Sequence, residues 1–221
     1  MTRRVVLLHG LWLPGASMRW HAARLGEAGF APEIFCYPTI GGGPTAALPR
    51  LIESLARADT HVLAHSLGGL VALTALQREP DLPVRRMVCL GSPLCGSAAA
   101  TGLAGRRLTA ATLGRSAGLL QRGCGCWEGA ARIGMIAGNT ALGLGRYFGR
   151  LEGPSDGTVA VAETRLPGLA DHVVIPTSHT GLLFSVQAAR LVAGFLRTGQ
   201  FQEARSGDGR PADAGGHGGI E

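Results

Sequence analysis

Residues 60–77 read Thr60-His-Val-Leu-Ala-His-Ser66-Leu-Gly-Gly-Leu-Val-Ala-Leu-Thr-Ala-Leu-Gln77. The apolar start of this segment predicts a strand, and the part from Leu67 onward predicts a helix. A serine between a strand and a helix, with small residues two positions before and after it, is typical of a nucleophile elbow. The small residues here are Ala64 and Gly68.

Small flanking residues have a steric reason. The elbow turn is so tight that its serine adopts strained backbone angles, and a branched side chain beside it would collide with the neighbouring strand or helix. Ala64 stands where glycine is usual, but alanine is small enough for the turn. A glycine-rich turn without a catalytic role is the alternative for this segment alone, so the rest of the chain has to decide.

Apolar runs alternate with helix-like segments along most of the chain. The runs are continuous, as expected for strands covered on both faces, and the alternation implies a mainly parallel sheet with helices on both sides. We therefore expect one α/β domain over residues 1–200 with about six strands. The expected strands are 4–9, 33–36, 60–64, 86–90, 132–137 and 172–175, and the expected helices are 16–28, 45–58, 67–78 and 181–197.

Two regions depart from this regular pattern. Residues 93–154 contain one expected strand but many glycines, and they form a candidate insert or lid. Within them, residues 98–120 carry an interrupted helical pattern that fits either a mobile lid or a scaffold helix. Residues 203–221 are Gly-rich and polar, which predicts a disordered tail.

The composition argues against several classes of function. All 21 basic residues are arginine, and 15 acidic residues leave a formal charge of +6. The arginines are scattered without a basic run, so we expect no nucleic-acid partner. No apolar run has membrane-spanning length, and the run 5–8 is too short for the core of a signal peptide. We therefore expect a cytoplasmic protein without stable membrane insertion.

The five cysteines do not predict a metal site. Their number is odd, and they lack the paired Cys-x-x-Cys spacing of a zinc centre. Cys36 and Cys89 lie in or beside expected strands, which predicts buried thiols. Cys124 and Cys126 could form a disulfide or bind a soft metal, but surface thiols in a Gly-rich loop are the favoured interpretation.

A serine nucleophile needs a base, and the base needs an orienting acid. His179 follows the last expected strand, at the sheet edge where parallel sheets place their sites. His172 is the rival, but it stands at the start of that strand and is expected to be structural. The acid is predicted at Asp156, on an Asp-Gly turn upstream of the base.

Other carboxylates compete for the role of the acid. They are Glu152, Glu163 and Asp171. Asp171 precedes a strand instead of following one, which places it at the wrong edge of the sheet. An Asp-Gly pair is by itself usually only a turn, so the prediction of Asp156 depends on its place in the chain order serine, acid, histidine.

Two backbone N–H groups are predicted to bind the oxyanion. One belongs to Leu67, which follows the serine, and the other to Leu11, in the loop after the first strand. Gly10 would let that loop turn sharply. Trp12 and Leu13 beside it would suit an apolar acyl group, although a tryptophan at a strand end equally serves core packing.

Together these segments resemble the α/β-hydrolase superfamily, and within it the small bacterial serine esterases and lipases. The segment 179–185 is very similar to that around the base in compact lidless lipases. The resemblance covers about residues 4–198 and implies a minimal α/β-hydrolase fold. The segments that carry it are His9-Gly-Leu11, Ala64-His-Ser-Leu-Gly-Gly69, Ser155-Asp-Gly-Thr-Val159, His179-Thr-Gly-Leu-Leu-Phe-Ser185 and the stretch Gly91-Ser-Pro with Gly96-Ser.

The resemblance also has departures. The first strand begins at Arg4, so the two antiparallel strands that start larger members are missing. The acid normally follows its strand closely, whereas residues 138–153 intervene before Asp156.

By resemblance, Ser66 is the nucleophile, Asp156 the acid and His179 the base, with oxyanion donors at Leu11 and Leu67. The implied function is hydrolysis of small-molecule or lipid esters with apolar acyl groups, through an acyl-enzyme and without a metal or organic cofactor. An acyltransferase or thioesterase with the same triad is the alternative, because a triad does not distinguish these reactions. A non-catalytic binding protein is disfavoured because a full triad can be assigned.

Overall fold

The computed structural model describes residues 2–39, 43–97, 116–142 and 153–201. Its strands are β1 (Arg4–Leu8), β2 (Ala31–Phe35), β3 (Thr60–His65), β4 (Val84–Leu90), β5 (Arg132–Gly138) and β6 (Asp171–Ile175). They form one sheet in the order β2-β1-β3-β4-β5-β6, and all neighbouring strands are parallel. The α/β class and the six parallel strands expected from the sequence are thereby confirmed.

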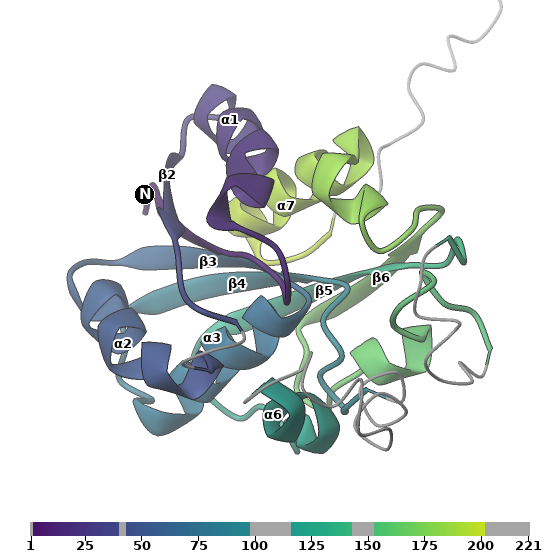
Figure 1. Cartoon of the computed structure of the whole chain (residues 1–221). Helices are drawn as coiled ribbons and strands as arrows, with labels where there is room; N and C mark the ends of the chain where they lie inside the picture. The colour runs from purple at the N-terminus through teal and green to yellow at the C-terminus, as the bar shows by residue number, and fades with distance from the viewer. Residues whose placement is uncertain (1, 40–42, 98–115, 143–152, 202–221) are drawn as a thin grey trace, which may run out of the picture.

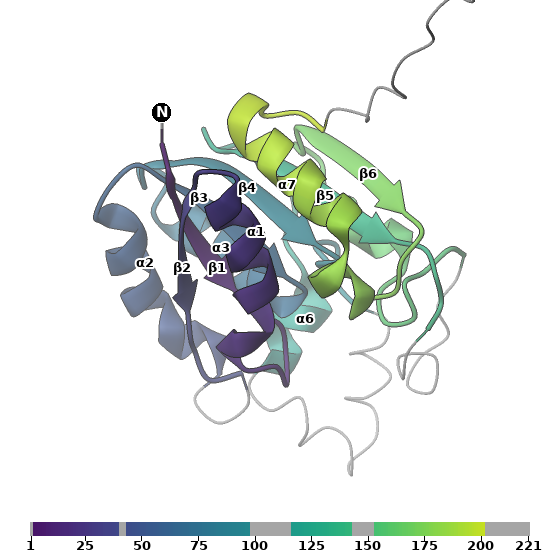
Figure 2. The same ribbon diagram turned by 90° about the horizontal axis from the view of Figure 1, so that it is seen from above.

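Helices cover both faces of this sheet (Figures 1 and 2). One face carries α1 (Arg19–Glu27) and α7 (Val186–Thr198), and the other carries α2 (Leu48–Ala56), α3 (Leu67–Arg78) and α6 (Ala117–Arg122). None of the described helices combines the length and the apolar character needed to cross a membrane. Short 3₁₀ helices lie at Gly15–Met18, Pro44–Ala47, Val161–Thr164 and Gly181–Phe184.

Each face of the sheet has its own apolar core. In β1, Val6 and Leu8 pack toward α2 and α3, whereas Val5 and Leu7 pack toward α1 and α7. All four side chains are fully buried, which explains why the strands read as continuous apolar runs. In the Gly-rich region, Leu120 of α6 joins the core on the α2 and α3 side. Residues 98–115 of the candidate lid and the expected tail 203–221 lie outside the described residues.

Two predictions about cysteines are wrong. Cys36 is exposed, because it follows the edge strand β2 instead of lying inside the sheet. Cys124 is buried in the core beside α3, and its N–H donates to the Leu94 carbonyl at 2.7 Å. Cys89 is buried and Cys126 exposed, as expected. The cysteines are all free thiols.

The order in which strands are added to the sheet reverses between β1 and β3. From β1 the chain passes through α1 to β2, and from β3 it passes through α3 to β4 on the opposite side. Parallel sheets bind their ligands outside the carboxyl ends of the strands at such a switch point. The loops that follow β1 and β3, with Leu11 and Ser66, begin there.

Replacing Gly68 with alanine is expected to destabilise the fold. A Cβ at this position would lie 2.8 Å from the His9 carbonyl oxygen and 2.9 Å from that of Leu8. The start of α3 would therefore have to move away from β1, which costs about 1–3 kcal/mol.

Gly26 provides the matched control for this measurement. It is also helical, but a Cβ there would meet nothing within 4 Å. Gly26→Ala should stabilise the protein by roughly 0.5–1 kcal/mol. Urea unfolding gives both values, and similar effects of the two substitutions would contradict the close approach of α3 to β1.

Candidate active site

Ser66 lies between β3 and α3 with φ 53° and ψ −122°. Trp12 is the one other described non-glycine residue with a positive φ. Such a conformation costs of order 1–3 kcal/mol and persists only where its surroundings enforce it. The Ser66 N–H donates to the Leu90 carbonyl at 2.9 Å, and its carbonyl accepts from the Gly69 N–H at 3.0 Å. These bonds, from β4 and from the first turn of α3, hold the strained turn.

Asp156 and His179 form a buried pair. The Asp156 Oδ2 atom accepts a hydrogen bond from His179 Nδ1 at 2.7 Å, and the acid is only 1% exposed. Its other carboxylate oxygen accepts from the N–H groups of Thr158 at 2.9 Å and Val159 at 2.7 Å. The loop itself is tied to the histidine, because the His179 N–H donates to the Asp156 carbonyl at 2.9 Å. A fully bonded carboxylate of this kind fixes the orientation of the imidazole.

The long chain segment before Asp156 does not keep it from the sheet. A Cβ on Gly138, the last residue of β5, would lie 2.9 Å from the Asp156 Cβ and 2.4 Å from the Thr177 carbonyl oxygen. The acid therefore lies against the carboxyl end of β5, as expected for an acid that follows its strand directly. Ser155 and Ala160 form an antiparallel bridge that closes the loop around it.

His65, for which the sequence predicts no role, connects the turn at Ser66 to His179. Its ring centroid lies 4.7 Å from that of His179, and its Nε2 lies 3.2 Å from the His179 carbonyl oxygen. Burial, and then the neighbouring His179, lower the pKa of His65 well below its usual value. The side chain is therefore neutral at pH 7, and Nε2 carries the proton that it donates to the carbonyl. Its place next to Ser66 in the sequence was the one available signal.

The loop after β1 is held by His9 and Tyr37. The two rings stack at 4.5 Å, and the Tyr37 hydroxyl donates to the His9 carbonyl at 2.6 Å. The Tyr37 N–H lies 3.4 Å from His9 Nε2, so the proton of His9 is on Nδ1, which donates to the Gly10 carbonyl at 3.1 Å. Tyr37 was also missed, because β2 brings it here from a distant part of the chain. Both contacts fix the backbone that leads to Leu11.

The predicted oxyanion donors lie at the two loops beside the switch point. Leu67 is the first residue of α3, so its N–H has no intrahelical acceptor and lies at the positive end of the helix. Leu11 is central in a turn closed by the Leu13 N–H and the Gly10 carbonyl at 3.4 Å. The Cβ position of Gly10 is 3.1 Å from the Ser66 Cβ, which brings this turn beside the serine.

The rival residues lie elsewhere. His172 Nε2 is bonded to the Thr164 hydroxyl at 2.8 Å, and Asp171 Oδ2 accepts from the Phe201 N–H at 2.7 Å. Glu163 accepts from the Ala160 N–H at 2.8 Å, and Glu152 lies outside the described residues. Of the described candidates for acid and base, Asp156 and His179 are the pair joined by a hydrogen bond between their side chains, whereas Asp171 accepts from the backbone N–H of His172 at 2.8 Å.

The two predicted acyl-binding residues differ in environment. Trp12 is 50% exposed, and its N–H donates to the Thr39 hydroxyl at 3.3 Å. Leu13 instead packs against the core beneath α1 and α7. Phe184, which follows His179 closely, is 56% exposed and contacts the Trp20 ring at 6.5 Å. Exposed apolar side chains thus lie in the loop after β1 and in the segment that follows His179.

Two further observations concern the contact of Ser66 with His179 and the groups that could bind a metal ion. Within the described part of the chain, Ser66 Oγ makes no hydrogen bond to His179. Catalytic hydrogen bonds are often long or poorly aligned without substrate and tighten when substrate binds. The described residues also contain no group of three or more His, Cys, Asp or Glu side chains that could hold a metal ion.

Known proteins resemble this chain in structure. No protein-family model and no curated sequence matches it. A lipase of Bacillus licheniformis is 18% identical at a TM-score of 0.67, over 89% of this chain and 91% of that one. A pyrethroid hydrolase of Sphingobium faniae is 17% identical at a TM-score of 0.60, over 90% of this chain and 98% of that one. Phospholipase PlaB of Legionella pneumophila is 14% identical at 0.60, over 90% of this chain and 57% of that one.

The free energy of unfolding is expected to fall as the pH drops below about 6.5. Burial lowers the pKa values of His9, His21 and His65 from their usual 6.5. In this range the unfolded chain therefore binds more protons than the folded chain. Each such histidine adds a slope of up to about 1.4 kcal/mol per pH unit.

Urea unfolding at about pH 7 and about pH 5.5 measures this slope. His21→Gln is the control, because glutamine can still donate to the Leu182 carbonyl, which lies 2.9 Å from His21 Nε2, but does not titrate. The slope should be shallower in this variant. Equal stability of the parent protein at the two pH values would contradict the neutral state of the buried histidines.

Proposed function

The chain has the α/β-hydrolase fold, and we propose that it is a serine hydrolase that cleaves carboxylic esters through an acyl-enzyme. The observation that carries the proposal is the 2.7 Å hydrogen bond between His179 Nδ1 and buried Asp156. It lies at the same sheet edge as Ser66, whose positive φ is the conformation of a nucleophile elbow. Structural neighbours include a lipase and a pyrethroid hydrolase, which supports this reaction class.

Acylation begins at Ser66. His179 keeps its proton on Nδ1, where it is hydrogen-bonded to Asp156. The unprotonated Nε2 atom is therefore the base and takes the proton of the Ser66 hydroxyl. The serine oxygen attacks the ester carbonyl, and the N–H groups of Leu11 and Leu67 stabilise the oxyanion. The tetrahedral intermediate then collapses. The alcohol leaves with the proton held by His179, and the acyl group stays on the serine.

Deacylation repeats these steps with water. His179 removes a proton from water, the hydroxide attacks the acyl-enzyme carbonyl, and the same N–H groups stabilise the second oxyanion. Collapse releases the carboxylic acid, and His179 returns the proton to the Ser66 oxygen. Asp156 keeps its negative charge throughout and stabilises the imidazolium that forms in each half-reaction.

Apolar acyl groups fit the surroundings of this triad. Trp12, in the loop with Leu11, is 50% exposed, and Phe184, five residues after His179, is 56% exposed. A bound alkyl chain that covered these side chains would remove the cost of hydrating them. Structural neighbours are described as a lipase, a phospholipase and a pyrethroid hydrolase, whose names point to apolar esters. We therefore propose esters with apolar acyl chains as the substrate class.

Ser66→Ala and His179→Ala are expected to abolish hydrolysis of p-nitrophenyl esters. The methyl group of alanine cannot form an acyl-enzyme, and without the imidazole no base remains for the serine. The double variant should be no less active than either single variant, because the two residues act as one unit.

His172→Ala is the control for these two variants, because its ring bonds Thr164 away from the triad. It should retain most of the activity. A fluorophosphonate should label the parent protein at Ser66 and leave Ser66→Ala unlabelled. Persistent hydrolysis or labelling in Ser66→Ala would refute the assignment, and an unlabelled parent protein would favour a non-catalytic binding role.

Asp156→Asn should fold normally but lose turnover, by up to roughly four orders of magnitude. An amide can select the wrong imidazole tautomer and does not stabilise the imidazolium. Asp171→Asn and Glu163→Gln should retain most of the activity, since these carboxylates bond backbone N–H groups away from His179. Normal turnover in Asp156→Asn, measured as kcat on the same esters, would show that the acid is misplaced.

A further inference from the structure

A cavity lies at the opposite end of the sheet from the candidate active site. Its volume is about 220 Å³, and it opens between the amino ends of the central strands, the turn before β2 and the end of α7. His61 in β3 and Arg86 in β4 are paired neighbours in the sheet and both line it. Arg3 and Arg197 complete the set of basic side chains around the cavity. None of the described lining residues is acidic.

Two polar atoms of this lining are buried without a partner among the described residues. They are Nδ1 of His61, a side chain that is 2% exposed, and Nε of Arg86. Arg86 uses another nitrogen to donate to the Leu196 carbonyl at 2.9 Å, which fixes its guanidinium beside the cavity. Buried polar groups are normally hydrogen-bonded, and a buried charge is normally paired. The backbone of Thr2 and of Arg86 lies close enough to the His61 ring to raise its pKa, so Arg86 Nε is the atom that clearly lacks the partner that such a position requires.

Other arginines at this end of the sheet are paired with carboxylates. Arg4 is paired with Glu33 and Arg85 with Asp59, each at 2.8 Å. In the described part of the chain, no carboxylate lies within ion-pair distance of Arg86 or of the other arginines around the cavity. Burial, and then the charge of Arg86, lower the pKa of His61 to about 4. The cavity is thus cationic and lacks a counter-charge.

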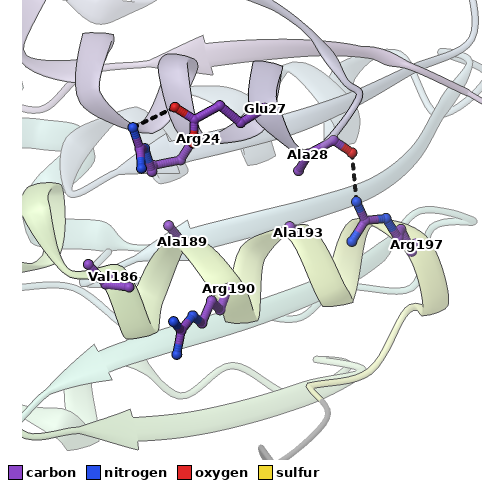
Figure 3. Close-up of a pocket in the computed structure, with 8 residues that line it drawn as sticks. All are labelled: Arg24, Glu27, Ala28, Val186, Ala189, Arg190, Ala193 and Arg197. Carbon is purple, nitrogen blue, oxygen red and sulfur yellow. Dashed lines mark hydrogen bonds and ion pairs between the residues drawn. The ribbon is translucent and has the colours of Figure 1, made fainter.

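Arg197 is fixed in place at the mouth of the cavity. Figure 3 shows its side chain extending from α7 to the Ala28 carbonyl, to which it donates at 2.6 Å. Its guanidinium also lies over the Phe30 ring at 5.5 Å, and that ring in turn contacts His61 edge-on at 6.2 Å. The same arginine borders a groove between α1 and α7 whose lining includes Arg190 (Figure 3). A basic group held by two contacts loses little freedom when it binds a ligand.

We propose that this cavity binds a doubly charged oxyanion, of which a phosphate group is the best match. Guanidinium groups present planar pairs of N–H donors that fit phosphate oxygens, and the bonds are strengthened by charge. An anion there would accept from Arg86 Nε, neutralise the arginines around it and accept from His61 when Nδ1 carries the proton. A small cavity of about 220 Å³ also fits one such group better than an extended polyanion, which needs a basic stripe.

Titration of the whole protein with inorganic phosphate tests the proposal. Ionic strength is held constant with NaCl, and binding is followed by thermal unfolding and by the NMR signals of the His61 ring. We expect a saturable rise in Tm of roughly 5 °C when phosphate exceeds its Kd by ~100-fold. Arg86→Gln and Arg197→Gln should each weaken binding by about tenfold or more.

Arg190→Gln is the matched control. It removes the same charge from α7 but does not line the cavity, so phosphate should bind this variant as it binds the parent protein. If Arg86→Gln does not fold, Arg197→Gln and the His61 signals still decide the outcome. A rise in Tm that does not saturate, or that is equal in Arg197→Gln, would be a general salt effect and would overturn the proposal.

Binding of a phosphate monoester shows whether the cavity takes free phosphate or the phosphate group of a larger ligand. Glycerol phosphate that binds at least as tightly as inorganic phosphate supports a site for the phosphate of a larger ligand, whereas weaker binding supports a site for the free anion. Ester hydrolysis by Arg197→Gln should match that of the parent protein, since the cavity and the triad lie at opposite ends of the sheet. The anion site and the proposed hydrolase activity are therefore tested separately.

Discussion

The strained backbone of Ser66 is the constraint on which the rest of the structure depends. A positive φ at a serine is stable only because β3 and α3, on either side of it, are almost completely buried and cannot shift independently. The bond from Ser66 N–H to Leu90 ties the turn to β4. The residues around the turn must be small, which is why Gly68 approaches the carbonyl oxygens of β1 so closely. Burial of the sheet therefore provides the energy that keeps the partly exposed serine in its strained conformation at the edge.

Neutral histidines extend this rigidity to the neighbouring loops. His65 is too deeply buried to be charged, and as a neutral donor it bonds the carbonyl of His179. His9, with Tyr37, does the same for the loop after β1. A charged His9 would lose the acceptor for the Tyr37 N–H, and a charged His65 would add repulsion beside His179. The proposed base can therefore gain a proton during the reaction without a second cation beside it.

Much of the fold and part of the candidate site could be predicted from local sequence patterns. The strands and the helix after Ser66 were predictable because buried parallel strands are continuously apolar and because the elbow has a short, steric signature. The contact between Asp156 and His179 agrees with the predicted chain order. The roles of His65 and Tyr37 were not predictable, because they depend on contacts between segments far apart in the chain. Cys36 was misplaced because the sequence does not reveal that β2 is an edge strand.

The wholly parallel sheet also has a consequence for how the chain folds. No two adjacent strands of this sheet are joined by a tight hairpin. The central neighbours β1 and β3, which pair Val5 with His61, are separated in the chain by α1, β2 and α2. Contacts between distant residues dominate, and loop closure has to precede the energy gained by pairing them. Folding should accordingly be slow for a domain of this size, with the apolar central strands exposed to aggregation until the sheet closes.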